Sequence, residues 1–230
     1  RFNARQMALY FGMVKCIDDN VGRVLKALRE ENILNRTLIV FTSDHGDMCG
    51  ELGRHNKGIP CEGSARIPFL IRAPGLIKPG TIVREALGTV DFKPTLLGLL
   101  GVNSKEAHEG RDATALLRTG KTPDNWEDVT FVRIGNAENK GKAWFGAFSR
   151  NYKLILSGSD RAGFFDLKND PNELRNSIDL PEHREKIRFL AKALNKYGQK
   201  HKDPLMELNA IRSDLKWAIE GTGPYGPAPR

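Results

Sequence analysis

The chain has 230 residues, of which 40% are hydrophobic, so it can bury a core as one large domain or as one domain with a small appendage. With this composition, disorder is not the default expectation. The 36 Lys and Arg residues outnumber the 28 Asp and Glu residues and give a net charge of +8, which favours anionic partners. No zinc-finger spacing, RNP-like aromatic motif or long basic block accompanies the charge, so we expect no nucleic-acid partner.

The cysteines and the first residues of the chain indicate whether it has disulfides or a zinc site and whether it is part of a longer protein. Cys16, Cys49 and Cys61 are too few and too scattered for a disulfide framework or a CxxC zinc site, and at most Cys49 and Cys61 could pair. No apolar run reaches membrane length, so we expect no membrane partner. The chain begins RFNARQMALYFG, without an initiator Met or a signal-peptide core, which suggests a piece of a longer protein.

A helix, a strand and a long loop are predicted first. Residues 7–28 carry apolar side chains at three- and four-residue spacing, which predicts an amphipathic helix that ends before Asn32. Residues 37–42 form a short β-branched run without polar alternation, typical of a central strand buried on both faces. Glycines and polar residues dominate from 46 to 65 and predict a long irregular loop, which in a compact domain is usually functional.

A second strand and a short helix are predicted next. Residues 67–72 are apolar, and Pro68 lies at their start, where a strand tolerates a missing N–H. Residues 81–89 are expected to be extended, and residues 95–100 to form a short helix closed by Gly101. The polar residues 103–128 predict a surface connection.

The pattern changes at Val129 to short strands separated by Gly, Asn and Ser, which predicts an antiparallel sheet. The strands are expected at residues 130–134, 144–149, 152–156 and 163–166. Pro181 opens a helix whose apolar face contains Ile187, Leu190, Ala191, Leu194 and Tyr197, and the Gly- and Pro-rich residues 221–230 predict an extended tail. We therefore divide the chain into an α/β unit at residues 1–128 and a second unit at residues 129–230.

Asp44 and His45 are adjacent at the carboxyl end of the first predicted strand, where open α/β sheets usually bind their ligands. The glycine-punctuated turn lets both side chains face one centre, and a carboxylate with an imidazole suits a divalent ion. Two ligands do not complete a metal site, so further ligands must come from elsewhere. Alternatively, Asp44 caps the loop and His45 is a packed loop histidine.

Lys57 and His55 lie in the loop that follows, with Lys57 thirteen residues after Asp44. If the loop brings the Lys57 ammonium group close to the metal, this group would stabilise negative charge that grows on the leaving group or on the transferring group. His55 could be a substrate contact or a proton donor. Without their context, both side chains could equally be ordinary solvated loop residues.

Five separated blocks of the sequence carry a family resemblance. Between about Tyr10 and about Asn176 they read TSDHGDMCGELGRHNKG, GSARIPFLIRAPG, TVDFKPTLLGLLGV, YKLIL and FFDLKNDPNELRN. In this order they resemble the C-terminal half of a type I sulfatase of the alkaline phosphatase superfamily. The resemblance implies an α/β fold: part of an alkaline phosphatase-like mixed sheet flanked by helices, followed by a smaller C-terminal antiparallel sheet plus a helix. Residues 1–128 would be the C-terminal part of the catalytic domain.

The resemblance also implies roles for three residues. In type I sulfatases the strand-end Asp and the Asn or His after it bind a calcium ion, which corresponds to Asp44 and His45 here, and a lysine at the spacing of Lys57 contacts the sulfate ester. With a histidine at position 45, Mn²⁺ or Zn²⁺ is also a possible ion, because imidazole is a softer ligand than oxygen. The implied substrate is a sulfated small molecule or glycan, and the implied compartment is periplasmic, secreted or lysosomal.

The nucleophile of the family is not among these residues. It is a formylglycine made from Cys or Ser in a C-x-P-x-R motif, which belongs to the N-terminal half of such enzymes. The run CEGSAR that begins at Cys61 lacks the proline, and its arginine is one position too far. We therefore expect the missing N-terminal half of the same enzyme as a partner, and no sulfatase activity from the 230 residues alone.

Three other interpretations fit the same residues. A phosphodiester or phosphonate ester hydrolase of the same superfamily would use the Asp-His pair and the lysine equally well. A non-catalytic module could use the basic surface to hold a polyanion. A scaffold subdomain would use Asp44 and His45 for packing only.

Overall fold

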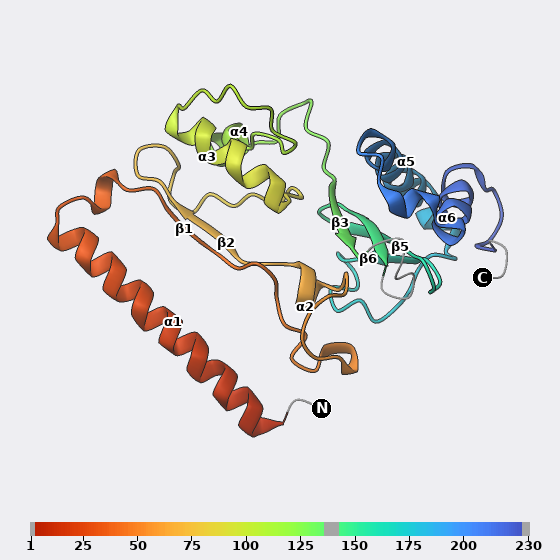
Figure 1. The fold of residues 1–230 in the computed structure, drawn as a ribbon, viewed down its shortest axis with the longest axis horizontal. Coiled ribbons are helices and arrows are strands. Elements are labelled where there is room, and N and C mark those ends of the chain that lie inside the picture. Colours follow the sequence, from red (N-terminus) through yellow and green to blue (C-terminus); the bar gives the residue numbers. More distant parts are fainter. Residues whose placement is uncertain (1–2, 136–142, 227–230) are drawn as a thin grey trace.

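The computed structural model describes residues 3–135 and 143–226, which form two antiparallel sheets and the helices around them (Figure 1). The elements are α1 (Ala4–Glu30), β1 (Ile39–Thr42), α2 (Glu62–Ala65), β2 (Phe69–Arg72), α3 (Phe92–Leu100), α4 (Thr114–Thr119), β3 (Thr130–Ile134), β4 (Trp144–Phe148), β5 (Tyr152–Ser157), β6 (Gly163–Asp166), α5 (Arg184–Lys200) and α6 (Asn209–Glu220). None of the described helices combines the length and the apolar character that a membrane-spanning helix requires.

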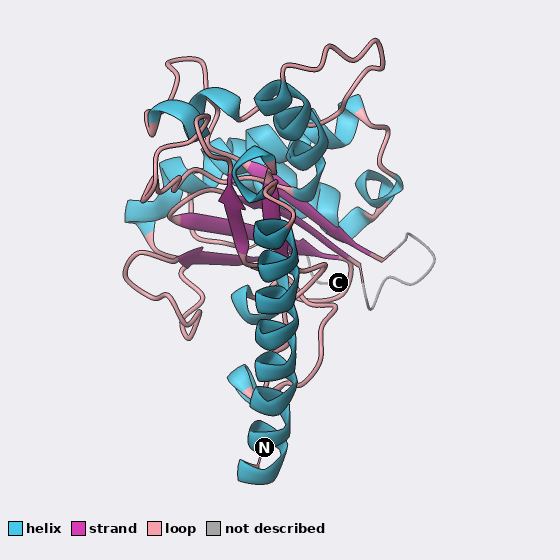
Figure 2. Cartoon of the chain, turned by 90° about the vertical axis from the view of Figure 1, so that its left-hand side faces the viewer, coloured by secondary structure: helices cyan, strands magenta, loops and turns pink. Residues whose placement is uncertain are grey.

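The N-terminal helix α1 confirms the predicted amphipathic helix, but it buries none of its 27 residues. A capping box starts it: the Gln6 backbone N–H donates to Asn3 Oδ1, and the Asn3 backbone N–H donates to Gln6 Oε1. Its large exposed apolar side chains are Leu9, Phe11, Met13, Val14, Ile17 and Val24. Figure 2 shows the N-terminal end of α1 projecting beyond both sheets, and none of the helix residues is buried.

Strands β1 and β2 form a two-stranded antiparallel sheet, with Ile39 opposite Arg72 and Thr42 opposite Phe69. Both predicted strands are therefore confirmed, and β2 begins directly after Pro68. The prediction that the first strand is buried on both faces is wrong for the described residues: Phe41 is exposed, and its partner Leu70 is 62% exposed. The physical reason is that each strand pairs only with the other in the part of the chain that the structure describes, so side chains such as Phe41 and Leu70 stay open to solvent.

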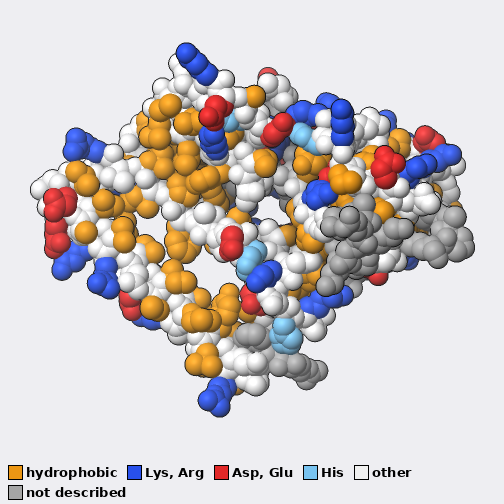
Figure 3. Space-filling view, in the orientation of Figure 1, with side chains coloured by type: hydrophobic (Ala, Val, Ile, Leu, Met, Phe, Trp, Pro, Cys, Tyr) orange, Lys and Arg blue, Asp and Glu red, His pale blue; other side chains and the backbone are white. Residues whose placement is uncertain are grey.

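The molecule exposes much more surface than its size requires. A compact monomer of 25.7 kDa has an accessible surface of about 10,400 Å², whereas this chain exposes 14726 Å². Figure 3 shows that hydrophobic side chains gather over α1 and the β1–β2 sheet. The excess area is therefore apolar to a large degree and lies in the N-terminal part.

Two predicted loops contain more structure than the sequence indicated. The loop over residues 46–65 includes a 3-10 turn at Glu51–Gly53 and the helix α2. The predicted surface connection over residues 103–128 contains α4, whose Leu116 and Leu117 are buried. Helix α3 is confirmed and spans Phe92–Leu100; Gly101 follows it, and its φ of 66° is the left-handed cap conformation for which glycine is suited.

The second sheet is a four-stranded antiparallel meander in the order β3-β4-β5-β6, as the strand pattern predicted. Helices α5 and α6 pack against β4 and β5 and against each other (Figure 1). Phe145, Leu154 and Phe164 from the sheet meet Ile187 and Leu194 from α5 in one core, and all five are fully buried. Helix α6 was not predicted. The boundary between residues 128 and 129 stays a prediction.

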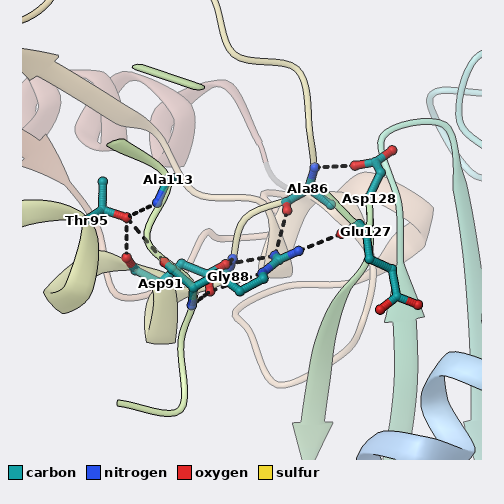
Figure 4. Close-up of polar contacts among 8 residues, drawn as sticks. Ala86, Gly88, Asp91, Thr95, Ala113, Glu127 and Asp128 are labelled. Atoms are coloured by element: carbon teal, nitrogen blue, oxygen red, sulfur yellow. Dashed lines mark hydrogen bonds and ion pairs between the residues drawn. The ribbon is translucent and has the colours of Figure 1, made fainter. Parts of the chain in front are cut away.

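A buried carboxylate connects the segment after β2 to the start of the second sheet (Figure 4). Asp91 accepts hydrogen bonds from the backbone N–H of Arg111 at 2.7 Å and from its Nη2 at 2.9 Å. The same guanidinium donates to the carbonyls of Ala86 at 3.0 Å and Glu127 at 2.6 Å, and Asp128 accepts from the Ala86 N–H at 2.6 Å. Because all of these groups are paired, the entry to β3 is held in a fixed place beside α3.

Candidate functional site

Asp44 and His45 lie directly after β1, and their side chains face each other. His45 Nε2 is 3.6 Å from Asp44 Oδ2, and the His45 backbone N–H donates to Asp44 Oδ1 at 2.9 Å. Ser43 Oγ donates to the His45 carbonyl at 2.8 Å, which holds the turn closed. The hydrogen bond from the His45 N–H is the main reason why the pKa of Asp44 lies below its usual value, so this carboxyl is ionised at neutral pH.

The hydrogen bond of the other ring nitrogen sets the tautomer of His45. Nδ1 lies 2.7 Å from the Gly46 carbonyl oxygen, which can only accept, so Nδ1 carries the proton. In the neutral imidazole the lone pair is then on Nε2, the nitrogen nearer to Asp44. The Asp44 side chain is 84% exposed and that of His45 40% exposed, so solvent and ligands reach both. A carbonyl that fixes the tautomer of a histidine is the usual arrangement around a metal-binding imidazole.

Gly46 brings this turn into direct contact with α2. Its N–H donates to the Ser64 carbonyl at 2.8 Å, and a Cβ on Gly46 would lie 2.1 Å from the Gly63 carbonyl oxygen. No side chain fits in that space, so glycine is required here. The Asp44–His45 pair is therefore held against residues 63 and 64.

Lys57 and His55 are both exposed and lie on a segment that the loop itself fixes. The Met48 N–H donates to the Asn56 carbonyl at 2.9 Å, and the Asn56 N–H donates to Asp47 Oδ1 at 3.2 Å. On the other side of Lys57, the Gly58 N–H donates to Ser64 Oγ at 3.2 Å. The backbone of Lys57 thus lies between two anchored residues, while its side chain is open to solvent.

Ser64 joins the two parts of the candidate site, and sequence reasoning missed it. Its carbonyl accepts from Gly46, which follows the Asp44–His45 pair, and its hydroxyl accepts from Gly58, which follows Lys57. Ser64 is buried at 5% exposure, so solvent does not compete for these bonds. Nothing in the local pattern marks this serine, because both partners come from distant positions in the chain.

Cys61 precedes α2 and has the properties of an ordinary residue. Burial, and secondarily the carboxylate of Glu173, raise the pKa of its thiol, which disfavours the thiolate that a nucleophile needs. Cys16, Cys49 and Cys61 are all free thiols, so Cys49 and Cys61 do not pair in this structure.

The ligand set for a metal ion is incomplete within residues 3–135 and 143–226. No group of three or more His, Cys, Asp and Glu side chains there is arranged to hold a metal ion. Asp44 and His45 form a pair of donors only, one anionic oxygen ligand and one neutral nitrogen ligand.

Comparison with known proteins covers the residues of this site. A family model described as sulfatase matches residues 1–102, which include Asp44, His45, His55 and Lys57. The chain is 37% identical over 202 residues to an arylsulfatase of Clostridium perfringens, an alignment that covers 84% of this chain and 40% of that protein. The chain thus spans less than half the length of that relative.

Two solved structures extend the comparison to the fold. A protein in complex with its substrate, D-glucosamine-2-N,6-O-disulfate, matches with a TM-score of 0.75 and 30% identity, over 86% of this chain and 42% of that chain. A phosphonate monoester hydrolase from Silicibacter pomeroyi matches with a TM-score of 0.72 and 27% identity, over 88% of this chain and 42% of that chain.

Proposed function

The chain belongs to the sulfatase family of the alkaline phosphatase superfamily, and we propose that it forms part of the catalytic site of a sulfuric ester hydrolase. It corresponds to the C-terminal part of such proteins and has their α/β fold. One observation carries the proposal: Ser64 fixes the backbone next to the Asp44–His45 pair and next to Lys57 at once. The chemistry of these three side chains then follows from their types and their exposure.

We propose that Asp44 and His45 are two ligands of a divalent cation, with Ca²⁺ as the expected ion and Mn²⁺ or Zn²⁺ as alternatives. Two observations support the fit: the carboxylate of Asp44 is ionised, and the Nε2 lone pair of His45 faces it. A bound cation would supply Lewis-acid polarisation of an ester oxygen. The remaining ligands would come from parts of the enzyme outside the described residues.

Lys57 would place an ammonium group against an anionic oxygen of the ester. Its exposed side chain can reach a bound substrate, and its anchored backbone limits where the ammonium can go. Charge that builds on the sulfuryl oxygens or on the leaving oxygen is then stabilised by a group already in place. His55, two residues earlier and also exposed, would contact the substrate or give a proton to the leaving group.

The nucleophile and the rest of the metal site are proposed to come from the N-terminal half of the same enzyme. No C-x-P-x-R motif occurs in the 230 residues, so the formylglycine of the family would lie outside them. The apolar face of α1 and the β1–β2 sheet offers a surface for that half: the chain exposes 14726 Å², about 4,300 Å² more than a compact monomer of this mass. We therefore propose that these residues alone do not hydrolyse sulfate esters.

The substrate is proposed to be a sulfated small molecule or glycan. A solved relative holds a glucosamine disulfate, and the net charge of +8 favours an anionic ligand. Hydrolysis of a phosphonate ester is the second candidate, because a phosphonate monoester hydrolase matches the fold nearly as well as the glucosamine disulfate-bound protein does.

Turnover by the complete enzyme tests the proposed function. With an aryl sulfate and an aryl phosphonate ester as parallel substrates, we expect faster turnover of the sulfate, loss of activity on chelation and recovery with Ca²⁺. Recovery only with Mn²⁺ or Zn²⁺ would change the metal and keep the reaction. Turnover of the phosphonate ester alone would replace the first candidate by the second.

A further inference from the structure

Lys153 is a fully buried lysine on the face of the second sheet that α5 and α6 do not cover. It has 0% of its surface exposed, and the next residue along β5, Leu154, points into the core with those helices. Successive side chains of a strand alternate between its two faces, so Lys153 points the opposite way. A buried ammonium group is tolerated only where charges and hydrogen bonds replace its hydration.

The groups that replace the hydration of the Lys153 ammonium come mainly from the loop over residues 46–65. Lys153 Nζ lies 2.6 Å from Glu173 Oε1, 2.9 Å from Glu62 Oε1 and 2.9 Å from the Pro60 carbonyl oxygen, and 4.6 Å from the ring centroid of Phe148. The three N–H groups of a lysine thus have three acceptors. Pro60 and Glu62 belong to the same loop as Lys57, so a residue of the second sheet holds that loop directly.

Glu173 completes the arrangement from the chain after β6. Its Oε1 accepts from Lys153, and its Oε2 accepts from the Glu62 backbone N–H at 2.6 Å. Glu173 is itself buried and has a φ of 55°, a backbone conformation that residues other than glycine adopt rarely. A conformation of this kind is retained where the surrounding contacts determine it, and here both carboxylate oxygens are used.

The loop residues that Lys153 holds are those on which the candidate site rests. Glu62 is the first residue of α2, and Ser64 lies in the same short helix. Ser64 in turn accepts hydrogen bonds from Gly46 and Gly58, the neighbours of His45 and Lys57. A continuous set of contacts therefore leads from β5 to both parts of the site.

We propose that Lys153 is a positioning residue: it fixes Pro60 and Glu62 so that Ser64 holds the Asp44–His45 pair and Lys57 in place. Its catalytic consequence rests on the proposed function, whereas the contacts themselves do not. The ammonium group touches no substrate and no reacting atom. It acts through α2, and it makes the second sheet a support for the chemistry of the first part of the chain.

The test is Lys153→Met in the complete enzyme, because Met is buried readily and has neither charge nor donors. We expect backbone amides of residues 46–65 to exchange hydrogen at least about tenfold faster, while those of α5 exchange as before. We expect kcat to fall by roughly 10- to 100-fold with a smaller change in KM, because bound substrate is misaligned with the reacting groups. Lys153→Met/Glu173→Gln also removes the carboxylate that the single variant leaves buried without its counter-charge, and serves if the single variant does not fold.

Arg133→Met is the matched control. Arg133 lies on β3 of the same sheet, and its Nε donates to the buried Asp203 at 2.5 Å and its Nη1 to the Gly135 carbonyl at 3.0 Å. The control removes a basic side chain and leaves a buried carboxylate without its counter-charge, at a site far along the chain from α2. We expect unchanged exchange in residues 46–65 and unchanged kcat.

Two results would overturn the proposal: unchanged exchange and kcat in Lys153→Met, or equally faster exchange in α5 and in residues 46–65, which would reveal general destabilisation. If the unaltered enzyme hydrolyses no sulfate ester, the proposed function fails, and the exchange data alone then decide whether Lys153 holds the loop.

Discussion

The two sheets of the molecule differ in what covers them. The β3–β6 sheet packs against α5 and α6 and shares with them a core of fully buried side chains, including Phe145, Leu154 and Leu194. The β1–β2 sheet and α1 leave large apolar side chains such as Phe11 and Leu70 open to solvent. Yet the candidate catalytic side chains follow β1. The buried core of the chain thus lies in one region and the proposed chemistry in the other, and the contacts of Lys153 join the second sheet to the loop over residues 46–65.

The largest effect expected in the exposed region is on turnover. Asp44→Ala in the complete enzyme should lower kcat/KM by roughly a thousandfold or more, because the proposed cation loses its anionic ligand. The thermal midpoint should fall only modestly, since the side chain is exposed and loses one backbone hydrogen bond together with the proposed cation. Steady-state kinetics and thermal melts measure both. The control is Asp179→Ala, an exposed carboxylate paired with Arg161, which should leave turnover unchanged. An active Asp44→Ala enzyme would favour the packing role for this pair.

The covered region should show the largest effect on stability. Phe164→Ala removes a fully buried ring that stacks on Tyr152 and should lower the free energy of unfolding by about 3–5 kcal/mol. Phe11→Ala, the same change on the open face of α1 at 62% exposure, should lower it by about 0.5 kcal/mol or less. Urea unfolding of the 230-residue chain measures both values. Equal losses would remove the difference between the two regions.

An intermediate effect is expected at the contact between the turn and α2. Gly46→Ala places a Cβ 2.1 Å from the Gly63 carbonyl oxygen and should lower the free energy of unfolding by about 1–3 kcal/mol. Gly22→Ala is the control: a Cβ there meets nothing within 4 Å, and alanine in mid-helix should stabilise by about 0.5–1 kcal/mol. Chemical unfolding followed by circular dichroism distinguishes the opposite signs. A neutral Gly46→Ala would mean that the turn does not rest on α2.

The smallest effect is expected where the apolar face is open. Leu70→Ser in the 230-residue chain should change the free energy of unfolding by no more than about 0.5 kcal/mol, because the side chain is 62% exposed. In the complete enzyme the same change should destabilise more, since the proposed N-terminal half covers this face. A comparison of thermal melts of the two proteins, each with and without the substitution, measures the difference. The same small shift in both would show that this face stays open.

The strands of the second sheet were predictable because local signals determine them. Short apolar runs separated by Gly, Asn and Ser turns placed all four strands of the meander within one residue at each end. The helix α6 was missed because no start signal precedes it: its N-cap position is Leu208, which offers no side-chain cap. The burial of β1 was predicted wrongly because an apolar run reports what a strand needs to bury, and not whether a covering layer is present.

The sequence indicated the candidate site residues, but not the residues that hold their backbone in place. Asp44, His45 and Lys57 follow from the order of the sequence blocks and from the position of the turn after β1. Their roles stay predictions. Ser64 and Lys153 act through partners up to 93 positions away, as between Lys153 and Pro60, and no local pattern reports contacts of that range.

The surface excess of the molecule has a hydrodynamic consequence. A helix of 27 residues is about 40 Å long, comparable with the diameter of a small domain, and here it contributes no buried side chain to anything. At a given mass, a less compact shape raises the friction that a molecule meets in solution. The isolated chain should therefore sediment slowly and leave a sizing column early for 25.7 kDa, and binding of the proposed N-terminal half should add mass while reducing the frictional ratio.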